Sequence, residues 1–296
     1  SSAASDVYKR QDLYMEKIAL IVDSASDIKQ DFAKLNNITI VPFKVICSDK
    51  EYIDGVDINS DTLYELLKRE VPSTSLPSVD SYASALKTAI KNGYTHAIII
   101  TISSGLSGSF NSARLAAESV PEINTFVLDS MTLTMSQGAI ALEALNMINS
   151  GRPFNEIIKI LPTFIDKVDV FFTMETLEYL IKGGRIGKVS GTIASVLNLK
   201  PIITVGTDGI YHTVSKIRGI NQSISKLASI LKPYTDEGPC KVWIMDGNAP
   251  DKAQMLYEAI KDYDNLVECN LGGCISPVLG LSLIHISEPT RLRCIS

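Results

Sequence analysis

The sequence predicts an α/β protein with two lobes: a doubly wound, mostly parallel sheet in the N-terminal lobe, followed by a second α/β lobe. A continuous apolar run at residues 97–102 breaks abruptly into hydroxyl and glycine residues, which is typical of a buried parallel strand that leads into a polar loop. Strand-like and helix-like segments alternate along the chain, as in a doubly wound layer architecture. After residue 165 the pattern changes, and the pair Asp208-Gly209 between two apolar segments indicates a β-hairpin.

In the N-terminal lobe, short runs of branched apolar residues predict strands, and apolar residues at helical spacing predict helices. The expected strands cover residues 18–22, 38–45, 96–102 and 125–128. The expected helices cover residues 28–35, 60–69, 79–91, 110–118 and 136–149. Ser60 is the expected N-cap of its helix, and the proline- and serine-rich residues 72–78 form an expected loop.

The second lobe starts with an expected strand at 168–173, a short helix at 175–182 and a basic loop at 183–188. Further strands are expected at 200–205, 210–214 and 241–245, with helices at 223–231 and 252–263. We therefore expect lobes at residues 15–165 and 166–280, with a ligand site in the crevice between them.

The two ends of the chain carry a signature of sequencing adapters. Residues 6–11 can be encoded by GATGTGTATAAGAGACAG, and residues 281–286 can be encoded by its reverse complement. We expect residues 1–14 to be a non-native leader and residues 281–296 a non-native tail, so that the native C-terminus is truncated. His285 and Cys294 then carry no functional argument.

The composition excludes several classes of protein. Of the 296 residues, 45% are hydrophobic and 21% are charged, which is typical of a globular chain. The net charge of −5 gives no support to nucleic-acid binding, and no apolar run has the length of a membrane helix. The cysteines are scattered and histidines are few, which argues against a zinc site and against a disulfide framework. We expect a cytoplasmic protein with no metal and no cofactor.

The loop after the strand at 96–102 is the main candidate for ligand binding. It contains Ser103, Ser104, Gly105, Ser107, Gly108 and Ser109. Ligands of open α/β sheets bind outside the carboxyl ends of the strands, where a helix start offers unpaired N–H groups and a positive dipole end. Serine hydroxyls can donate to an anion there, and glycines allow close approach of the backbone. The alternative is a capped helix start with no ligand.

Three further loops lie where a strand ends or a helix begins. Asp23 and Ser24 follow the first strand, where a simple helix cap is the alternative to ligand contact. Thr74 and Ser75 belong to a proline-stiffened loop that could also be only a rigid connector. The fourth loop contains Gly183, Gly184, Arg185 and Lys188, and it could bind a phosphate or an acidic partner or be a solvated basic turn.

Taken together, these segments resemble the DegV family, fatty-acid-binding proteins that include the FakB-like partners of bacterial fatty acid kinase. The resemblance spans roughly residues 15–280 in the family's order. It rests on Asp23-Ser24, Thr74-Ser75-Leu76-Pro77-Ser78, the segment 103–109, Leu128-Asp129-Ser130, the segment 180–186, Lys200-Pro201-Ile202 and Lys216-Ile217-Arg218-Gly219.

The resemblance implies a two-lobed carrier that holds a long-chain fatty acid in an apolar tunnel. In the family, residues at the positions of Thr74 and Ser107 bind the carboxylate, and the other loop residues support them. A separate FakA-like kinase then phosphorylates the bound acid, and the acyl phosphate enters phospholipid synthesis. The carrier itself is then not an enzyme. We expect the loop with Arg185 and Lys188 to face that partner or a phosphate, because charges would be costly in an apolar tunnel.

The chain departs from the family near its C-terminus. The family usually has a histidine in a His-x-Gly-Pro-Gly-like motif there, whereas this chain has the segment 272–280 without histidine. Two alternative functions remain open. A serine hydrolase could use Ser107, although the G-x-S-x-G spacing fails and only His96 and His212 remain as bases. A phosphate- or nucleotide-binding module could use residues 103–109, although the lysine of a P-loop is missing.

Overall fold

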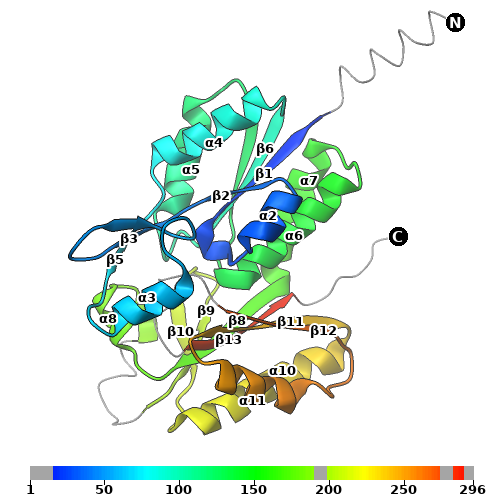
Figure 1. Ribbon diagram of the computed structural model, residues 1–296. Helices are drawn as coiled ribbons and strands as arrows, with labels where there is room; N and C mark the ends of the chain where they lie inside the picture. The colour runs from blue at the N-terminus through cyan, green and yellow to red at the C-terminus, as the bar shows by residue number, and fades with distance from the viewer. Residues whose placement is uncertain (1–15, 190–198, 274–282, 290–296) are drawn as a thin grey trace, which may run out of the picture.

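A computed structural model describes residues 16–189, 199–273 and 283–289 of the chain, the last range as backbone only. Two α/β lobes are stacked one on the other, with a small third sheet at the side of the first lobe (Figure 1). Among the described residues, no helix has both the length and the apolar character that a membrane span requires.

The N-terminal lobe is built on a four-stranded parallel sheet. Its order is β2-β1-β6-β7, and its strands are β1 (Ile18–Asp23), β2 (Ile38–Val41), β6 (His96–Thr101) and β7 (Asn124–Asp129). Apolar side chains of β1 and β6 are buried on both faces, as expected for central parallel strands. The carboxyl ends of all four strands point towards the second lobe (Figure 1).

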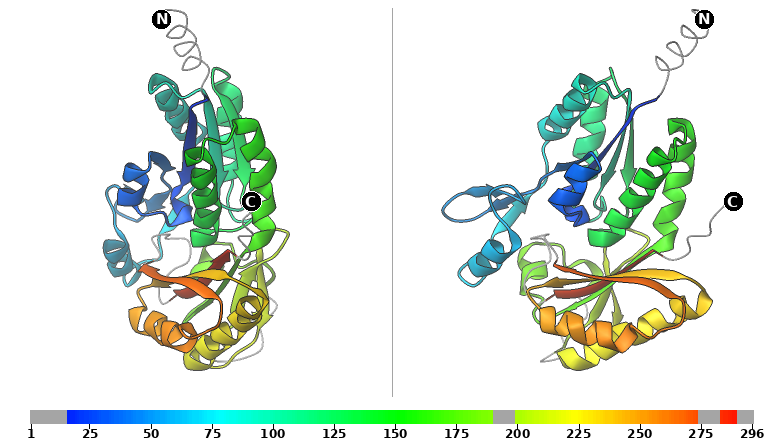
Figure 2. Two further views of the ribbon diagram at one scale, coloured as in Figure 1. Left: turned by 90° about the vertical axis from the view of Figure 1, so that its right-hand side faces the viewer. Right: turned by 45° about the vertical axis from the view of Figure 1, so that its right-hand side comes forward.

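Helices cover both faces of this sheet, so the doubly wound prediction is confirmed. On one face, α4 (Val79–Lys91) and α5 (Ser109–Ser119) enclose a core that includes Tyr82 and Leu86. On the other face, α6 (Thr134–Asn149) and α7 (Phe154–Ile160) bury Ile140 and Phe154 (Figure 2). The short helix α2 (Gln30–Leu35) lies beside α6.

The small sheet has the order β4-β3-β5 and is antiparallel, and α3 (Ser60–Leu67) packs on it. Its strands are β3 (Lys44–Ile46), β4 (Glu51–Ile53) and β5 (Ser73–Ser75). The single strand predicted at 38–45 is wrong: the chain leaves the first sheet at Pro42, which has no N–H to donate, and enters the second. The predicted loop at 72–78 contains β5, in which Thr74 pairs with Val45.

The second lobe has a six-stranded mixed sheet in the order β10-β9-β8-β13-β11-β12. Its strands are β8 (Val168–Met174), β9 (Ile202–Val205), β10 (Tyr211–Ser215), β11 (Cys240–Gly247), β12 (Leu266–Gly273) and β13 (Leu283–Pro289). The predicted hairpin is confirmed, since β9 and β10 are antiparallel and are joined by the turn with Asp208 and Gly209. Two helices, α10 (Ile220–Glu237) and α11 (Pro250–Ile260), cover the face of the sheet that lies away from the first lobe.

Strand β13 lies outside the expected limit of this lobe, which was residue 280. Its backbone pairs antiparallel with β8 on one side and β11 on the other. Without it, two strands in the middle of the sheet would each leave a row of N–H and C=O groups unpaired. Ladder hydrogen bonds use the backbone alone, so this stretch fills the position whatever its origin. Its origin as a translated adapter stays a prediction.

The lobes meet through a shared apolar cluster, which we call the interlobe cluster. It includes Ile102, Leu106, Leu133 and Met135 from the first lobe and Val170, Phe172, Ile203 and Met245 from the second. The remaining elements are α8 (Glu178–Lys182) and the 3-10 helices η1 (Ser24–Ser26), η2 (Leu161–Lys167) and η3 (Gly187–Val189). Helix α6 packs against β8, so the second sheet has helices of one lobe or the other on both faces.

The N-cap of α3 differs from the prediction. Asn59 has extended backbone angles, and its side-chain oxygen accepts a hydrogen bond from the Thr62 N–H, whereas Ser60 is the first helical residue. Asparagine caps as well as serine does, and only the residue before the first helical turn can reach these N–H groups.

We expect Asn59→Ala to lower the free energy of unfolding by about 1 kcal/mol, because it removes this cap. Ser60→Ala is the matched control and should change the same quantity by only about 0.3 kcal/mol. Urea unfolding of both variants measures the difference. Equal destabilisation by the two substitutions would contradict the assignment of the cap.

Candidate functional site

The loop between β6 and α5 touches the second lobe directly. The Ser103 hydroxyl donates to the carbonyl of Gly209, at 2.7 Å, in the turn of the β9–β10 hairpin. At Gly105, a Cβ would lie 2.5 Å from the same carbonyl oxygen. The Ser103 hydroxyl is therefore committed to joining the lobes. Ser104 is exposed, and its N–H donates to Asp129.

Asp23 holds this loop by hydrogen bonds to residues at both of its ends. Its carboxylate is fully buried and accepts hydrogen bonds from the Ile102 N–H (2.9 Å), the Ser109 hydroxyl (2.8 Å) and the Gln137 amide (2.9 Å). Tyr82 reaches the same Ser109 hydroxyl at 2.7 Å. Burial raises the pKa of Asp23, although its hydrogen bonds, which include one from the Ala25 backbone, oppose that change. Asp23 and Ser109 thus position the loop.

Ser24 connects the first lobe to the small sheet. Its hydroxyl donates to Asp54 at 2.6 Å and accepts the Phe43 N–H at 3.1 Å. Asp54 is buried, and the loss of solvation raises the pKa of its carboxyl to about 7. The small sheet, which carries Thr74, is fixed to the first lobe through this contact.

Thr74 and Ser107 lie on neighbouring segments. The Leu76 side chain, two residues after Thr74, comes within 3.3 Å of the point that a Cβ on Gly108 would occupy, and Gly108 follows Ser107. Both Thr74 and Ser107 are half-buried, as is Ser75. The Ser107 hydroxyl accepts the Ser109 N–H at 3.2 Å.

The hydroxyl hydrogens distinguish these two residues from their neighbours. Within the described part of the chain, neither Thr74 nor Ser107 donates to a protein acceptor, whereas Ser24, Ser103 and Ser109 do. Two half-buried donors on adjoining segments can therefore serve an anionic ligand. The placement of a carboxylate between them stays a prediction.

The basic loop at residues 183–188 lies closer to the serine loop at residues 103–109 than the sequence indicated. Arg185 is half-buried, and its Nε donates to the Leu106 carbonyl at 3.4 Å, next to Ser107, while its Nη1 donates to Gly183 at 2.7 Å. Gly183, Gly184 and Lys188 are exposed. The pattern of charges in the sequence could not show that the guanidinium reaches the serine loop.

Lys188 is exposed but already paired. Its ammonium lies 2.7 Å from Asp208, which also meets His212 at 2.8 Å. The Lys188 ammonium and the His212 ring together hold the pKa of the Asp208 carboxyl well below its usual range. These contacts tie the basic loop to the β9–β10 hairpin.

The two histidines outside the expected tail occupy other places. His96 lies beside Thr95, with its ring 4.6 Å from that of Phe154, and His212 is bound to Asp208. A hydrolase would need one of them as a base for Ser107. Neither makes that contact in the described part of the chain, which argues against the hydrolase alternative.

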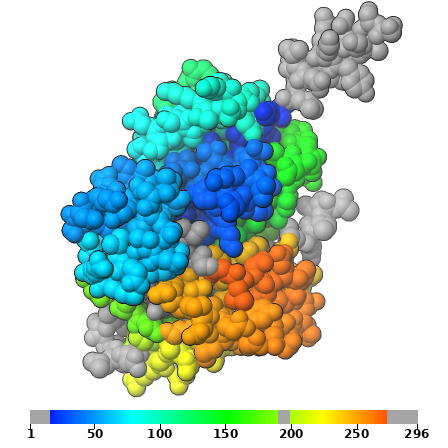
Figure 3. Space-filling model, in the orientation of Figure 1, coloured from blue at the N-terminus to red at the C-terminus, as the bar shows by residue number. Residues whose placement is uncertain are grey.

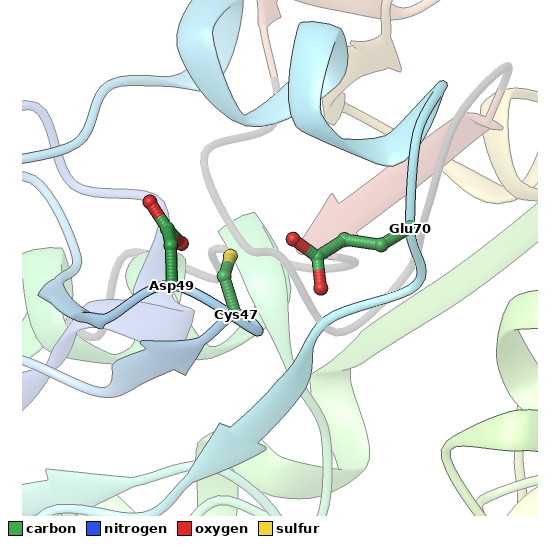
Figure 4. A group of neighbouring side chains, drawn as sticks. All are labelled: Cys47, Asp49 and Glu70. Atoms are coloured by element: carbon green, nitrogen blue, oxygen red, sulfur yellow. The ribbon is translucent and has the colours of Figure 1, made fainter.

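Cys47, Asp49 and Glu70 form a group close enough to consider as metal ligands, and it lies at one end of the small sheet (Figure 4). Their ligand atoms lie within 4.8 Å of one another. Glu70, however, already accepts the N–H and the hydroxyl of Ser48, at 2.9 and 3.1 Å. Burial and the two carboxylates raise the pKa of the Cys47 thiol, which disfavours the thiolate that a metal requires. The position of Glu70 is therefore explained by its hydrogen bonds to the turn at Ser48.

Comparison with known proteins extends these observations. A family profile described as "Uncharacterised protein, DegV family" matches residues 17–284. A DegV domain-containing protein of Clostridium acetobutylicum is 40% identical over 267 residues, which cover 90% of this chain and 95% of that protein.

Two solved structures have the same architecture. DegV, a fatty acid binding protein from Bacillus subtilis, has a TM-score of 0.84 and 26% identity, and the match covers 93% of this chain and 100% of that one. A stearic acid-binding protein from Eubacterium ventriosum has a TM-score of 0.79 and 28% identity, covering 93% and 98%.

We expect Gly105→Ala to weaken the junction of the lobes, because its new methyl group would meet the Gly209 carbonyl at 2.5 Å, and backbone cannot give way cheaply. The free energy of unfolding should fall by about 1–3 kcal/mol. Gly108→Ala is the control, since its methyl group would meet only the flexible end of Leu76, at 3.3 Å. Urea unfolding measures both, and an equal effect would refute the close approach of the lobes.

A second prediction concerns Asp54, whose pKa is raised from 3.8 to about 7 by folding. A raised pKa contributes stability that is complete below about 4 and is lost as the pH rises through about 7. The free energy of unfolding should therefore fall with rising pH in this window, by at most about 1.4 kcal/mol per pH unit from this group. Asp54→Asn should flatten that dependence in unfolding titrations between about pH 5 and about pH 8. An unchanged slope would show that Asp54 does not titrate there.

Proposed function

Because this chain belongs to the DegV family, we propose that it binds one long-chain fatty acid between its lobes and holds the carboxylate with Thr74 and Ser107. The observation that supports this most directly is that, among the described residues, the Thr74 and Ser107 hydroxyls donate to no protein acceptor, and that Ser107 follows Leu106, a member of the interlobe cluster. A carboxylate needs such donors, and an acyl chain needs such an apolar neighbour.

The polar groups around the head have different tasks in this proposal. Thr74 and Ser107 donate to the carboxylate, and the start of α5, with Gly108 as its N-cap, adds a favourable dipole contribution of roughly 0.3–1 kcal/mol. Arg185 contributes a positive charge next to Ser107. Ser75, Ser103, Ser104, Gly105 and Gly108 with Asp23 and Ser24 shape and support the loops.

The tail supplies most of the affinity. Burying about 15 methylenes at about 0.8 kcal/mol each gives on the order of 12 kcal/mol before ordering costs. Each hydroxyl hydrogen bond to a carboxylate contributes about 1.5–3 kcal/mol. The head group therefore fixes which end of the ligand faces outwards more than it determines whether the ligand binds.

We further propose that the protein is a cytoplasmic carrier that takes no cofactor. A separate FakA-like fatty acid kinase phosphorylates the presented carboxylate, and the acyl phosphate feeds phospholipid synthesis. The loop with Gly183, Gly184 and Lys188 is exposed at the edge of the site, which suits contact with that kinase or with a phosphate. Mass spectrometry of ligand extracted from purified protein tests the basic claim, because a stoichiometric nucleotide without lipid would overturn it.

We expect the double variant Thr74→Val, Ser107→Ala to keep the fold and most tail-driven affinity but to lose its preference for a fatty acid over the alcohol of equal length. Loss of two charged hydrogen bonds should reduce that preference by at least about tenfold. Kinase-dependent phosphorylation should collapse as well, because the carboxylate is no longer held in one geometry. Competition binding with the acid and alcohol measures the preference. Ser104→Ala, an exposed hydroxyl of the same loop, is the control, and a preference retained by the double variant would contradict the site.

A further inference from the structure

The small sheet that carries Thr74 is attached to the first lobe at the open end of its β3–β4 hairpin. Phe43 directly precedes β3 and Asp54 directly follows β4, and the Asp54 N–H donates to the Phe43 carbonyl at 3.0 Å. The Ser24 hydroxyl of the first lobe joins both residues, since it accepts the Phe43 N–H at 3.1 Å and donates to the Asp54 carboxyl at 2.6 Å. All three residues are buried. Ser24 thus closes the hairpin and holds it on the lobe.

The position of Thr74 depends on this hairpin. Its strand β5 pairs with β3, where Ser75 lies opposite Lys44, the residue after Phe43. The small sheet and α3 project from the side of the first lobe in Figures 1 and 3. A shift of the hairpin end therefore moves Thr74 relative to Ser107, which belongs to the first lobe itself.

The Asp54 carboxyl lies in a place that disfavours its charge. Asp54 and Asp27, an acid in the turn after η1, are each only 3% exposed. Burial raises the pKa of Asp54 to about 7, against the Ser24 hydrogen bond and with a smaller contribution from Asp27. Within the described residues, no lysine, arginine or histidine side chain forms an ion pair with Asp54. An ionised Asp54 therefore has no compensating charge from that part of the chain.

The other groups near this place are directed elsewhere or are neutral. Asp23 binds the serine loop and Gln137. Asp57, three residues after Asp54, is exposed and accepts the Ile53 N–H. From α2, the uncharged amide of Gln30 comes within 3.2 Å of the point that a Cβ on Gly55 would occupy. Among these acids, Asp54 is the one that is both buried and bonded to the hairpin end.

We propose that Asp54 is a positioning residue: while uncharged it holds the hairpin end against Ser24 and so keeps Thr74 beside Ser107, and its ionisation releases the hairpin end. The inference rests on the proposed function, in which Thr74 donates to the ligand's carboxylate. A buried carboxylate is stable as an ion only when it is hydrated, and water reaches Asp54 when the hairpin end separates from Ser24. The preference of the protein for an acid head group then falls as the pH rises. By linkage, a bound acid in turn favours the uncharged form of Asp54.

Asp54→Asn separates the charge of this residue from its position, because an amide oxygen still accepts from Ser24 but does not ionise. The probes are hexadecanoic acid and hexadecanol, which compete for the purified full chain, and mass spectrometry measures the bound amounts. Between about pH 6 and about pH 8.5, the wild-type preference for the acid should fall at least about fivefold relative to that of Asp54→Asn, and by no more than about tenfold per pH unit, since one proton is involved. The ratio between the two proteins removes the titration of the ligand itself. Asp57→Asn, at an exposed acid of the same loop, is the matched control and should follow the wild type.

The two possible failures of this experiment are distinguishable. Parallel pH profiles of the wild type and Asp54→Asn would overturn the inference and leave the proposed function intact. A lack of acid preference in both proteins at every pH would overturn the proposed function as well.

Ser24→Ala tests the same contact from the other side, and it serves also if Asp54→Asn does not fold. The substitution removes the hydroxyl that joins Phe43 and Asp54. At about pH 6 the acid preference of this variant should be about fivefold below that of the wild type, and it should stay there up to about pH 8.5, because the hairpin end is already released. Circular dichroism checks that the variant is folded. A folded Ser24→Ala variant with the wild-type preference and the wild-type pH profile would overturn the inference.

Discussion

The buried carboxylate of Asp23 is the constraint on which the geometry of the site depends. It stands at the end of β1 and binds the backbone after β6, the first turn of α5 and the side chain of Gln137 in α6. Ser109, held by Asp23, donates its N–H to the Ser107 hydroxyl. A buried charge of this kind is tolerated only when it is fully hydrogen-bonded, so the three elements are fixed in one arrangement. The orientation of the half-buried Ser107 hydroxyl is thus set by a carboxylate that is itself fully buried.

The junction of the lobes combines polar and apolar contacts with separate roles. The Ser103 hydroxyl donates to the Gly209 carbonyl, and Arg185 donates to the Leu106 carbonyl. The Gly105 backbone also passes close to Gly209. These contacts set the relative position of the loops. The interlobe cluster beneath them is large and apolar.

Local sequence patterns were sufficient for the elements that are buried on two sides or regularly amphipathic. The strand at Ile98–Ile100 and the helix at Val79–Lys91 follow from apolar runs and helical spacing alone. Patterns failed where tertiary context decides: Pro42 separates two strands that read as one, and β12, with Glu268, Asn270 and two glycines, lacks a clear alternation. The Ser103–Gly209 bond joins residues 106 positions apart, and no local signal could predict it. The candidate loops themselves were identifiable, because hydroxyl and glycine residues at the ends of parallel strands are a local signal.

Strand β13 has a consequence for the assembly of the second lobe. It occupies an interior position of the sheet, yet it is the last of the described strands along the chain, and its two neighbours β8 and β11 come from segments far apart in sequence. The six-stranded sheet is therefore complete only once residues 283–289 are in place. Before that moment β8 and β11 present two facing, unsatisfied edges, which is the arrangement that donor-strand exchange exploits. The lobe is a split sheet that one short strand, β13, completes.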